Sequence, residues 1–313
     1  MSIEKIKNVI NNLNSGENWT VQVFKINTCK HNGESRVNYC CRKIKLRPEV
    51  ELEGYFKEIM NLYLGDGKKS IDSYKDLRVY DGSTDGLTIY KLCTDDKLIS
   101  DEYICFNNAI ANASKESNPL DYNSAFLVKG TLNLNGSEVV VKIVSMMKPI
   151  TQLRRKFILF GDEFVKCKQP VLNLRPIIDV IIVDNVVYFM NLSGEKLFNM
   201  ERSYKIICNE KIKDIEQAGI VSNMETFKEV ASTGHNPRKF VAFNDNCLKA
   251  MKNPAVLKTI AEQFKIPIND SGTQFNTAVK GASEDIIKVL CNRAMLHPIN
   301  LEAFEVDGAQ RWK

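Results

Sequence analysis

The chain has 313 residues, of which 44% are hydrophobic and 26% are charged. This composition is typical of a folded protein with a sizeable core and excludes a disordered chain, and at about 150 residues per domain the length predicts two domains. Lys and Arg total 43 and Asp and Glu total 38, so the net charge of +5 permits nucleic-acid binding through a local patch without requiring it.

The first third of the sequence changes between helical and extended patterns. Residues 3–13 carry apolar side chains at helical spacing, and "WTVQVFKI" then alternates as a strand does. "SRVNYCCRKIKLRP" continues as extended chain, residues 50–63 form a second helical stripe, and short β segments follow near 77–80 and 87–93. The start lacks an uninterrupted apolar core and does not resemble a secretory signal, so a cytoplasmic protein is expected.

A candidate domain boundary lies in the polar stretch "NASKESNPLDYNS", residues 112–124, which contains Pro119 and little apolar content. We therefore expect an N-terminal α+β domain over residues 1–115 and a second α+β domain over residues 116–313.

Two hairpins are predicted beyond this boundary. "SAFLVKGTLNL" and "SEVVVKIVSM" flank Asn135-Gly136, a pair that accepts the positive φ angles of a type I′ turn. Residues 180–183 and 186–190 are β-branched and aromatic runs separated by Asp184-Asn185, which makes Asp184 a turn residue. Charges interrupt this apolar region, and it is too short for the roughly 20 residues of a membrane-spanning helix.

Helix starts dominate the remaining sequence. Ser222-x-x-Glu225 has capping-box spacing, Asn253-Pro254 predicts a second helix start, and Ser283 predicts a third. Strands followed by helices indicate the α+β class, with mixed or antiparallel β-hairpins and helices segregated toward the C-terminal part.

Asp179 raises a separate question, because period-two geometry places it on an apolar face where an unpaired carboxylate is costly. One interpretation makes it a structural hydrogen-bond hub. The other combines Asp179 with a nearby carboxylate, Glu163 or Glu138, and with Lys142 in a divalent-metal nuclease site. The structural interpretation is preferred, so no residue is assigned as catalytic and none as a metal ligand.

Basic residues are concentrated in one stretch of the second half. A phosphate-binding surface with salt-dependent affinity forms if they converge on one face, and a solvated charged face is the alternative for any single cluster. The expected DNA-contacting residues are Arg154, Arg155, Lys156, Lys166, Lys168, Arg175, and Arg238 with Lys239 in the loop "GHNPRKF".

Motifs for metals and cofactors are incomplete. "DGSTDG" begins like a calcium loop, but Leu92 stands where the bidentate Glu belongs. "GDGKKS" has Lys69 where a phosphate loop needs Ser or Thr. The nine cysteines include no C-x-x-C pair and the three histidines lack a metal-binding context, so no cofactor is expected.

Four segments of the second half resemble the Kiwa anti-phage protein KwaB-like family: "RPIIDVIIVDNVVYFMNLSGEKLF", "NMETFKEVA", "NPAVLKTIAEQF" and "AFEVDGAQRW". The resemblance follows a fold pattern rather than a catalytic signature. It implies a cytosolic component of a two-protein bacterial defence system that binds DNA and acts with a membrane-embedded partner, KwaA. The partner would recruit it to the inner face of the membrane, and a homo-oligomer, a dimer, is also expected.

The favoured hypothesis is a DNA-binding effector that grips phosphates, with a metal-dependent nuclease acting on phage DNA and a non-enzymatic scaffold of the same complex as alternatives. Reversal of Arg154, Arg155 and Lys156 to Glu is expected to weaken DNA binding, because it replaces phosphate-attracting charges by repelling ones. Fluorescence anisotropy measures the affinity, and an unchanged melting temperature shows that the fold is retained. Unchanged affinity removes this patch from the hypothesis.

Overall fold

The computed structural model describes residues 3–31, 34–46, 52–113, 121–151, 157–160, 163–166, 171–297, 299 and 301–306. The chain divides into two compact units. Unit 1 comprises Met1–Val79 and Gly86–Met200, and unit 2 comprises Tyr80–Asp85 and Glu201–Lys313. A division between residues 115 and 116 stays a prediction, and it runs through unit 1.

Unit 1 is built on an eight-stranded sheet in the order β2-β1-β5-β6-β11-β12-β4-β3. Every pairing is antiparallel except that of β3 with β4, which is parallel. The sheet is therefore mixed, as the sequence predicts. Its strands are β1 (Glu17–His31), β2 (Glu34–Ile44), β3 (Asp76–Val79), β4 (Thr88–Cys93), β5 (Ala125–Leu134), β6 (Ser137–Ser145), β11 (Val180–Val183) and β12 (Val186–Phe189).

Helices and small ladders complete unit 1. The helices are α1 (Ile3–Asn11), α2 (Glu53–Leu64) and α3 (Ser100–Ala111), with 3-10 segments η1 (Leu13–Ser15), η2 (Ile71–Ser73) and η4 (Leu192–Phe198). Two short antiparallel ladders join β7 (Ile150–Thr151) to β10 (Val171–Leu172) and β8 (Phe157–Phe160) to β9 (Glu163–Lys166).

Both predicted hairpins are confirmed, together with the turn chemistry that predicts them. Asn135 and Gly136 have φ angles of 53° and 81°, and Asp184 and Asn185 have φ angles of 50° and 57°. These left-handed values are those of type I′ turns, which match the twist of the strands they join. The first turn pairs Leu134 with Ser137 and so sets the register of β5 against β6.

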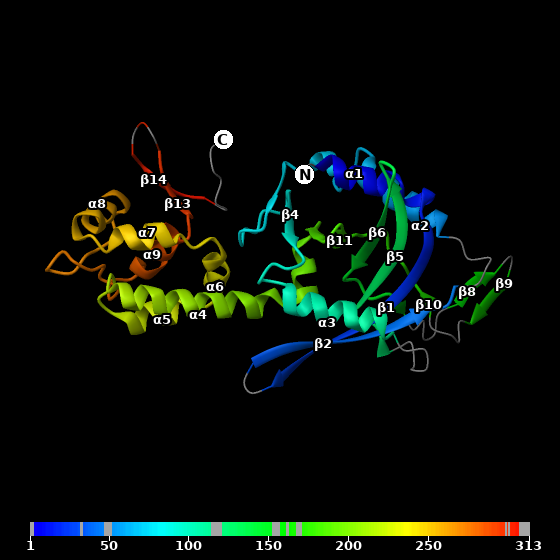
Figure 1. The fold of residues 1–313 in the computed structure, drawn as a ribbon, viewed down its shortest axis with the longest axis horizontal. Helices are drawn as coiled ribbons and strands as arrows, with labels where there is room; N and C mark the ends of the chain where they lie inside the picture. Colours follow the sequence, from blue (N-terminus) through cyan, green and yellow to red (C-terminus); the bar gives the residue numbers. More distant parts are fainter. Residues whose placement is uncertain are drawn as a thin grey trace. The chain divides into compact units, whose positions relative to one another are not determined.

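The sheet of unit 1 has two different faces because side chains alternate along each strand. One face carries Val23, Val128 and Ile143 and packs against α1 and α2. On the other face α3 packs against β2, and Phe106 of this helix stacks on Phe24 at 5.2 Å between ring centroids. Figure 1 shows α1 and α2 on one side of the sheet and α3 on the other.

Unit 2 contains most of the C-terminal helices, which confirms the α+β class with helices segregated toward the C-terminal part. Asn253 accepts a hydrogen bond from the Ala255 N–H at 3.0 Å and caps α8, as expected. None of the helices among the described residues is long and apolar enough to cross a membrane. The elements are α4 (Met200–Ala218), α5 (Met224–Ala231), α6 (Asn236–Lys239), η5 (Phe240–Ala242), α7 (Asp245–Met251), α8 (Pro254–Phe264), α9 (Ala282–Leu290), β13 (Ala294–Leu296) and β14 (Ala303–Glu305).

Two predicted helix starts are displaced, the first by one residue and the second by two. Asn223, rather than Ser222, caps α5 by accepting a hydrogen bond from the Thr226 N–H at 3.3 Å. Gly281 precedes α9 in a left-handed conformation, and Ser283 is a buried residue inside the first turn. In each case a nearby residue, Asn223 or Gly281, precedes the helix in place of the predicted serine.

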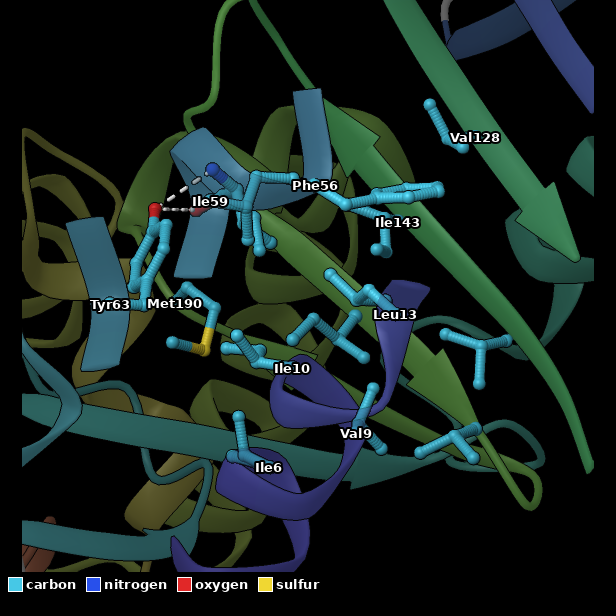
Figure 2. Packing of buried hydrophobic residues seen from close by; sticks show 14 of the residues in the cluster. Ile6, Val9, Ile10, Leu13, Phe56, Ile59, Tyr63, Val128, Ile143 and Met190 are labelled. Carbon is cyan, nitrogen blue, oxygen red and sulfur yellow. Dashed lines mark hydrogen bonds between the residues drawn. The ribbon is translucent and has the colours of Figure 1, made fainter. Parts of the chain in front are cut away.

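Tyr63 of α2 ties the helix layer to the backbone that leads into β11 (Figure 2). Its hydroxyl accepts a hydrogen bond from the Ile178 N–H at 2.8 Å and donates one to the Ile178 carbonyl at 3.2 Å. Burial raises the pKa of this phenol, so it keeps its proton and can donate. The Tyr63 hydroxyl thus pairs with both backbone polar groups of buried Ile178, and the carbonyl also accepts a hydrogen bond from the Asn191 amide at 3.0 Å. A buried backbone group without a partner is costly.

We predict that Tyr63→Phe lowers the free energy of unfolding by about 1–3 kcal/mol, because the Ile178 N–H loses its partner while remaining buried. The Ile178 carbonyl keeps a hydrogen bond from the Asn191 amide at 3.0 Å. Urea unfolding followed by far-ultraviolet circular dichroism measures this change.

Tyr55→Phe is the matched control. Tyr55 lies on the same helix and is also buried, but its hydroxyl has no hydrogen-bond partner among the described residues. Its removal is expected to leave stability unchanged or to raise it slightly. Equal destabilisation by the two substitutions would contradict the role given to the Tyr63 hydroxyl.

Candidate functional site

A cleft of about 430 Å³ lies on the α3 face of the sheet in unit 1. Its floor is formed by strands β2, β1, β5 and β6, and its wall by the C-terminal end of α3. Three lysines line it, together with three carboxamides, two threonines and a small apolar group. The described residues that line it include no carboxylate.

The register of the sheet explains why the lysines meet. Lys129 of β5 lies directly opposite Lys142 of β6 on one side and opposite Thr20 of β1 on the other. Lys43 of β2 lies opposite Gln22 of β1. These positions share one face of the pleat, so their side chains project to the same side as α3.

A β-bulge shapes the end of the cleft at Asn18. Between the pairs Glu17–Thr131 and Thr20–Lys129, β1 contains one more residue than β5. Asn18 adopts a φ angle of 57°, and a bulge of this kind redirects the neighbouring side chains. Trp19 turns to the opposite face, where a Cβ on Gly130 would stand 2.4 Å from its ring. Gly130 therefore lets Trp19 lie flat on β5 while Asn18 and Thr20 line the cleft.

The positive charge of the cleft is not neutralised by carboxylates. Within the described part of the chain, Lys43, Lys129 and Lys142 make no ion pair. Lys142 is held by neutral groups: its Nζ donates to Asn107 Oδ1 at 2.7 Å and lies 5.4 Å from the centre of the Tyr103 ring. Like charges directly opposite each other on neighbouring strands are destabilising, so this arrangement favours a bound anion.

Gln22 is the buried polar group of the cleft, with an exposed fraction of 6%. Its Oε1 accepts a weak hydrogen bond from the Cys41 thiol at 3.6 Å. The described residues provide no partner for its amide N–H groups, although a carboxamide can donate two hydrogen bonds. The amide nitrogen of Gln22 is open to the cleft, so its N–H groups can donate to water or to a ligand there.

Of the four residues named in the nuclease hypothesis, only Lys142 lines the cleft, and Glu138 is exposed in β6 outside the lining. Asp179 precedes β11, and its N–H donates to the Val144 carbonyl at 3.0 Å. Because Ile182 of β11 lies opposite Lys142, the odd offset of three residues directs Asp179 to the other face of the sheet. Glu163 is exposed in β9, which belongs to a separate two-stranded ladder. The structure does not bring the side chains of Asp179, Glu163 and Lys142 together.

Asp179 is a hydrogen-bond hub, as the structural interpretation of the sequence holds. Its carboxylate accepts hydrogen bonds from the Met146 N–H at 2.6 Å and from the Ser193 hydroxyl. Burial, and next the negative charge of Asp179, raise the pKa of the Tyr74 phenol. Among the described residues, no three His, Cys, Asp or Glu side chains form a group that could hold a metal ion.

The predicted DNA-contacting residues are distributed over several parts of the molecule. Arg154, Arg155, Lys156 and Lys168 lie outside the described residues, and Lys166 is part of β9. Arg175 is exposed and follows β10. The β7–β10 ladder continues with a hydrogen bond from Asn173 N–H to the Pro149 carbonyl at 2.7 Å, so Arg175 and exposed Lys148 lie at the same end of it.

Arg238 and Lys239 belong to α6 in unit 2, where Arg238 is engaged with the chain itself. Its guanidinium donates to the carbonyls of Gly82 and Ser83, both at 2.9 Å. It also lies over the rings of Tyr80 and Tyr204, at 5.6 and 5.7 Å from their centres. Arg238 thereby holds the segment Tyr80–Asp85 within unit 2.

Sequence reasoning missed Lys129, Gln22 and Asn107 as parts of a site. A signal for the first was present, because a two-residue turn at Asn135-Gly136 necessarily sets Lys129 opposite Lys142. Gln22 and Asn107 join the site only through the pairing of β1 with β5 and the packing of α3, which no local pattern specifies.

The fold and the cleft define an α+β protein with a cationic surface site suited to an anionic ligand. A family model described as Kiwa protein KwaB-like matches residues 124–300. The chain belongs to this family, which confirms the resemblance noted in the sequence and implies a role in Kiwa anti-phage defence. No match was found among curated proteins or among solved structures.

We predict that Arg238→Ala destabilises unit 2 by about 2 kcal/mol, because two charge-assisted hydrogen bonds to buried carbonyls are lost. Hydrogen-exchange mass spectrometry of peptides containing Tyr80–Asp85 is expected to show faster exchange. Lys239→Ala is the control, since no hydrogen bond of its side chain is found among the described residues. Identical exchange in both variants would show that Arg238 does not hold this segment.

Proposed function

We propose that this protein is the DNA-binding component of a Kiwa anti-phage system and that the lysine cleft holds DNA phosphates. The observation that carries the proposal is the cross-strand pair of Lys129 and Lys142 in a cleft whose described lining residues include no carboxylate. Phosphate contacts from lysines supply the sequence-independent part of DNA affinity. A defence protein that meets foreign DNA of any sequence requires this kind of recognition.

The charge arrangement supports binding of a polyanion in particular. Two lysines held side by side repel each other until an anion lies between them, so phosphate binding relieves an unfavourable interaction as well as adding a favourable one. Lys43, two strands from Lys129, extends the positive surface along the floor of the cleft. Successive phosphates of one strand are suited to such a row.

A second DNA contact is proposed for the segment that connects β7 to β10. This segment runs from Thr151 to Val171 and carries the basic residues Arg154, Arg155, Lys156, Lys166 and Lys168. Exposed Lys148 and Arg175 stand at its base. Their charge would lengthen the DNA contact beyond the cleft and increase its dependence on salt.

Binding rather than cleavage is the proposed activity, because Asp179 uses its carboxylate on Met146 and Ser193 and faces away from Lys142. We further propose that the protein works in the cytoplasm as a homodimer. A membrane partner of the KwaA type would recruit it to the inner face of the membrane. DNA entering at the membrane would then meet the protein there.

We predict that the double variant Lys129→Gln, Lys142→Gln weakens binding of a labelled duplex that carries a single-stranded tail. Loss of two phosphate contacts is expected to reduce the slope of log affinity against log salt concentration by roughly 1.5. Fluorescence anisotropy across a salt series measures both the affinity and the slope.

The matched control is Lys69→Gln, Lys97→Gln, which removes the same charge from exposed positions of unit 1 outside the cleft. It is expected to change the slope little. Thermal unfolding accompanies each measurement, and Lys129→Gln should not lower the melting temperature, because it relieves repulsion with Lys142. Equal loss of affinity in both double variants would leave only a general charge effect, and no binding by the wild type at low salt would end the proposal.

A further inference from the structure

We infer that the cleft takes one unpaired nucleotide, with its base inside and its phosphates on the lysines, and that it does not take a base pair. This inference rests on the proposed function and deepens it, because it specifies which form of DNA the site holds. The chemistry recognised is that of a nucleoside phosphate, either within a single strand or as a free molecule.

The volume of the cleft suits an unpaired base. A volume of about 430 Å³ falls in the range of pockets that enclose small organic molecules. In a duplex the bases are stacked and paired inside the helix, so a pocket on a protein surface meets only phosphates and groove edges. An unpaired base is free to leave the strand and enter such a pocket. Phosphate binding alone requires a surface and does not require a pocket of this volume.

An apolar wall stands beside the lysines. Val140 is 50% exposed and lies opposite Thr131, two residues from Lys142 on the same face of β6. Ile110 and Ala111 of α3 form the opposite wall. An exposed valine next to two lysines suits a ligand that has an apolar part and an anionic part, as a nucleotide does.

Carboxamides provide the polar contacts between these parts. Gln22 lines the cleft with its amide N–H groups unpartnered among the described residues, and it is 6% exposed. Asn107 accepts from Lys142 through its Oδ1, so its amide nitrogen stays available to donate. Exposed Asn18 stands at the bulge. Donors of this kind can meet the carbonyl oxygens and ring nitrogens of any base.

Among the described residues that line the cleft there is no aromatic side chain. Proteins that bind single strands tightly through bases use aromatic stacking platforms, which add affinity for every base. Here the lysines must supply most of the affinity, and the aliphatic wall and amides distinguish an unpaired base from a paired one. The expected behaviour is a preference for single strands with little preference among bases.

The test compares two labelled probes bound to the full chain by fluorescence anisotropy at one salt concentration. One is a single-stranded oligothymidine. The other is a duplex whose two ends are closed by short linkers in place of nucleotide loops, so that it has no unpaired nucleotide. Thymidine 3′,5′-bisphosphate serves as competitor, since it reproduces one nucleotide with both of its phosphates.

Two variants separate the cleft from the rest of the surface. Lys129→Gln removes a phosphate contact, and Ala111→Leu fills the cleft without changing charge. Asn108→Leu is the control for the second, because Asn108 is exposed on the same helix but does not line the cleft. Each cleft variant is expected to lose about tenfold in affinity for the single strand and less than twofold for the closed duplex, whereas the control keeps the wild-type values.

The outcomes distinguish the inference from the proposed function. Equal affinity of the wild type for both probes, with equal losses in the cleft variants, overturns the inference while DNA binding stands. If neither DNA binds but the bisphosphate binds in calorimetry and is lost in Lys129→Gln and Ala111→Leu, the site takes a free nucleotide and the DNA-binding proposal falls. Absence of binding by all three ligands overturns both.

Discussion

The register between β5 and β6 is the constraint on which both the core and the cleft depend. It is set by the turn at Asn135 and Gly136, and it places Val128 opposite Ile143 on one face and Lys129 opposite Lys142 on the other. A slip by one residue would exchange the faces, burying the lysines under α1 and α2 and exposing the core residues. The register fixed by this turn therefore assembles the hydrophobic core and the cationic cleft together.

The sheet also keeps the buried carboxylate of Asp179 away from the lysines. Asp179 satisfies the Met146 N–H, at the point where β6 has ended, and the Ser193 hydroxyl at the start of η4. In a similar way, the Tyr63 hydroxyl hydrogen-bonds the backbone N–H and carbonyl of Ile178. These polar anchors stabilise irregular backbone at the edge of the core, and they lie on the face opposite Lys142. The carboxylate thus contributes to the fold without neutralising the charge on which the proposed binding depends.

Sequence patterns over a few neighbouring residues predicted those features that depend only on such neighbours. Both type I′ turns, the cap at Asn253 and the α+β class follow from residue types at fixed spacing. The helices α3 and α4 were missed for different reasons. α4 carries an apolar stripe at helical spacing, which was passed over among the many charged residues of the helix. The buried members of this stripe are Tyr204, Ile207, Cys208, Ile212 and Ile215. α3 contains Cys and Asn residues that weaken its pattern. The pairing of β1 with β5 joins residues more than 100 positions apart, and no spacing in the sequence specifies it.

The end of α3 explains why the site lies where it does. Upstream in this helix, Phe106 covers the aromatic part of the sheet face, and the helix ends at Ala111 beside the row of Thr20, Lys129 and Lys142. A longer helix lying on that row would bury two lysines without counter-charges, which is far more costly than leaving them in a cleft. The pair of opposed lysines therefore requires that α3 end at Ala111. Beyond the end of α3, Lys129 and Lys142 are accessible to a ligand. An anion bound there removes the repulsion between the two lysines, and this relief favours binding.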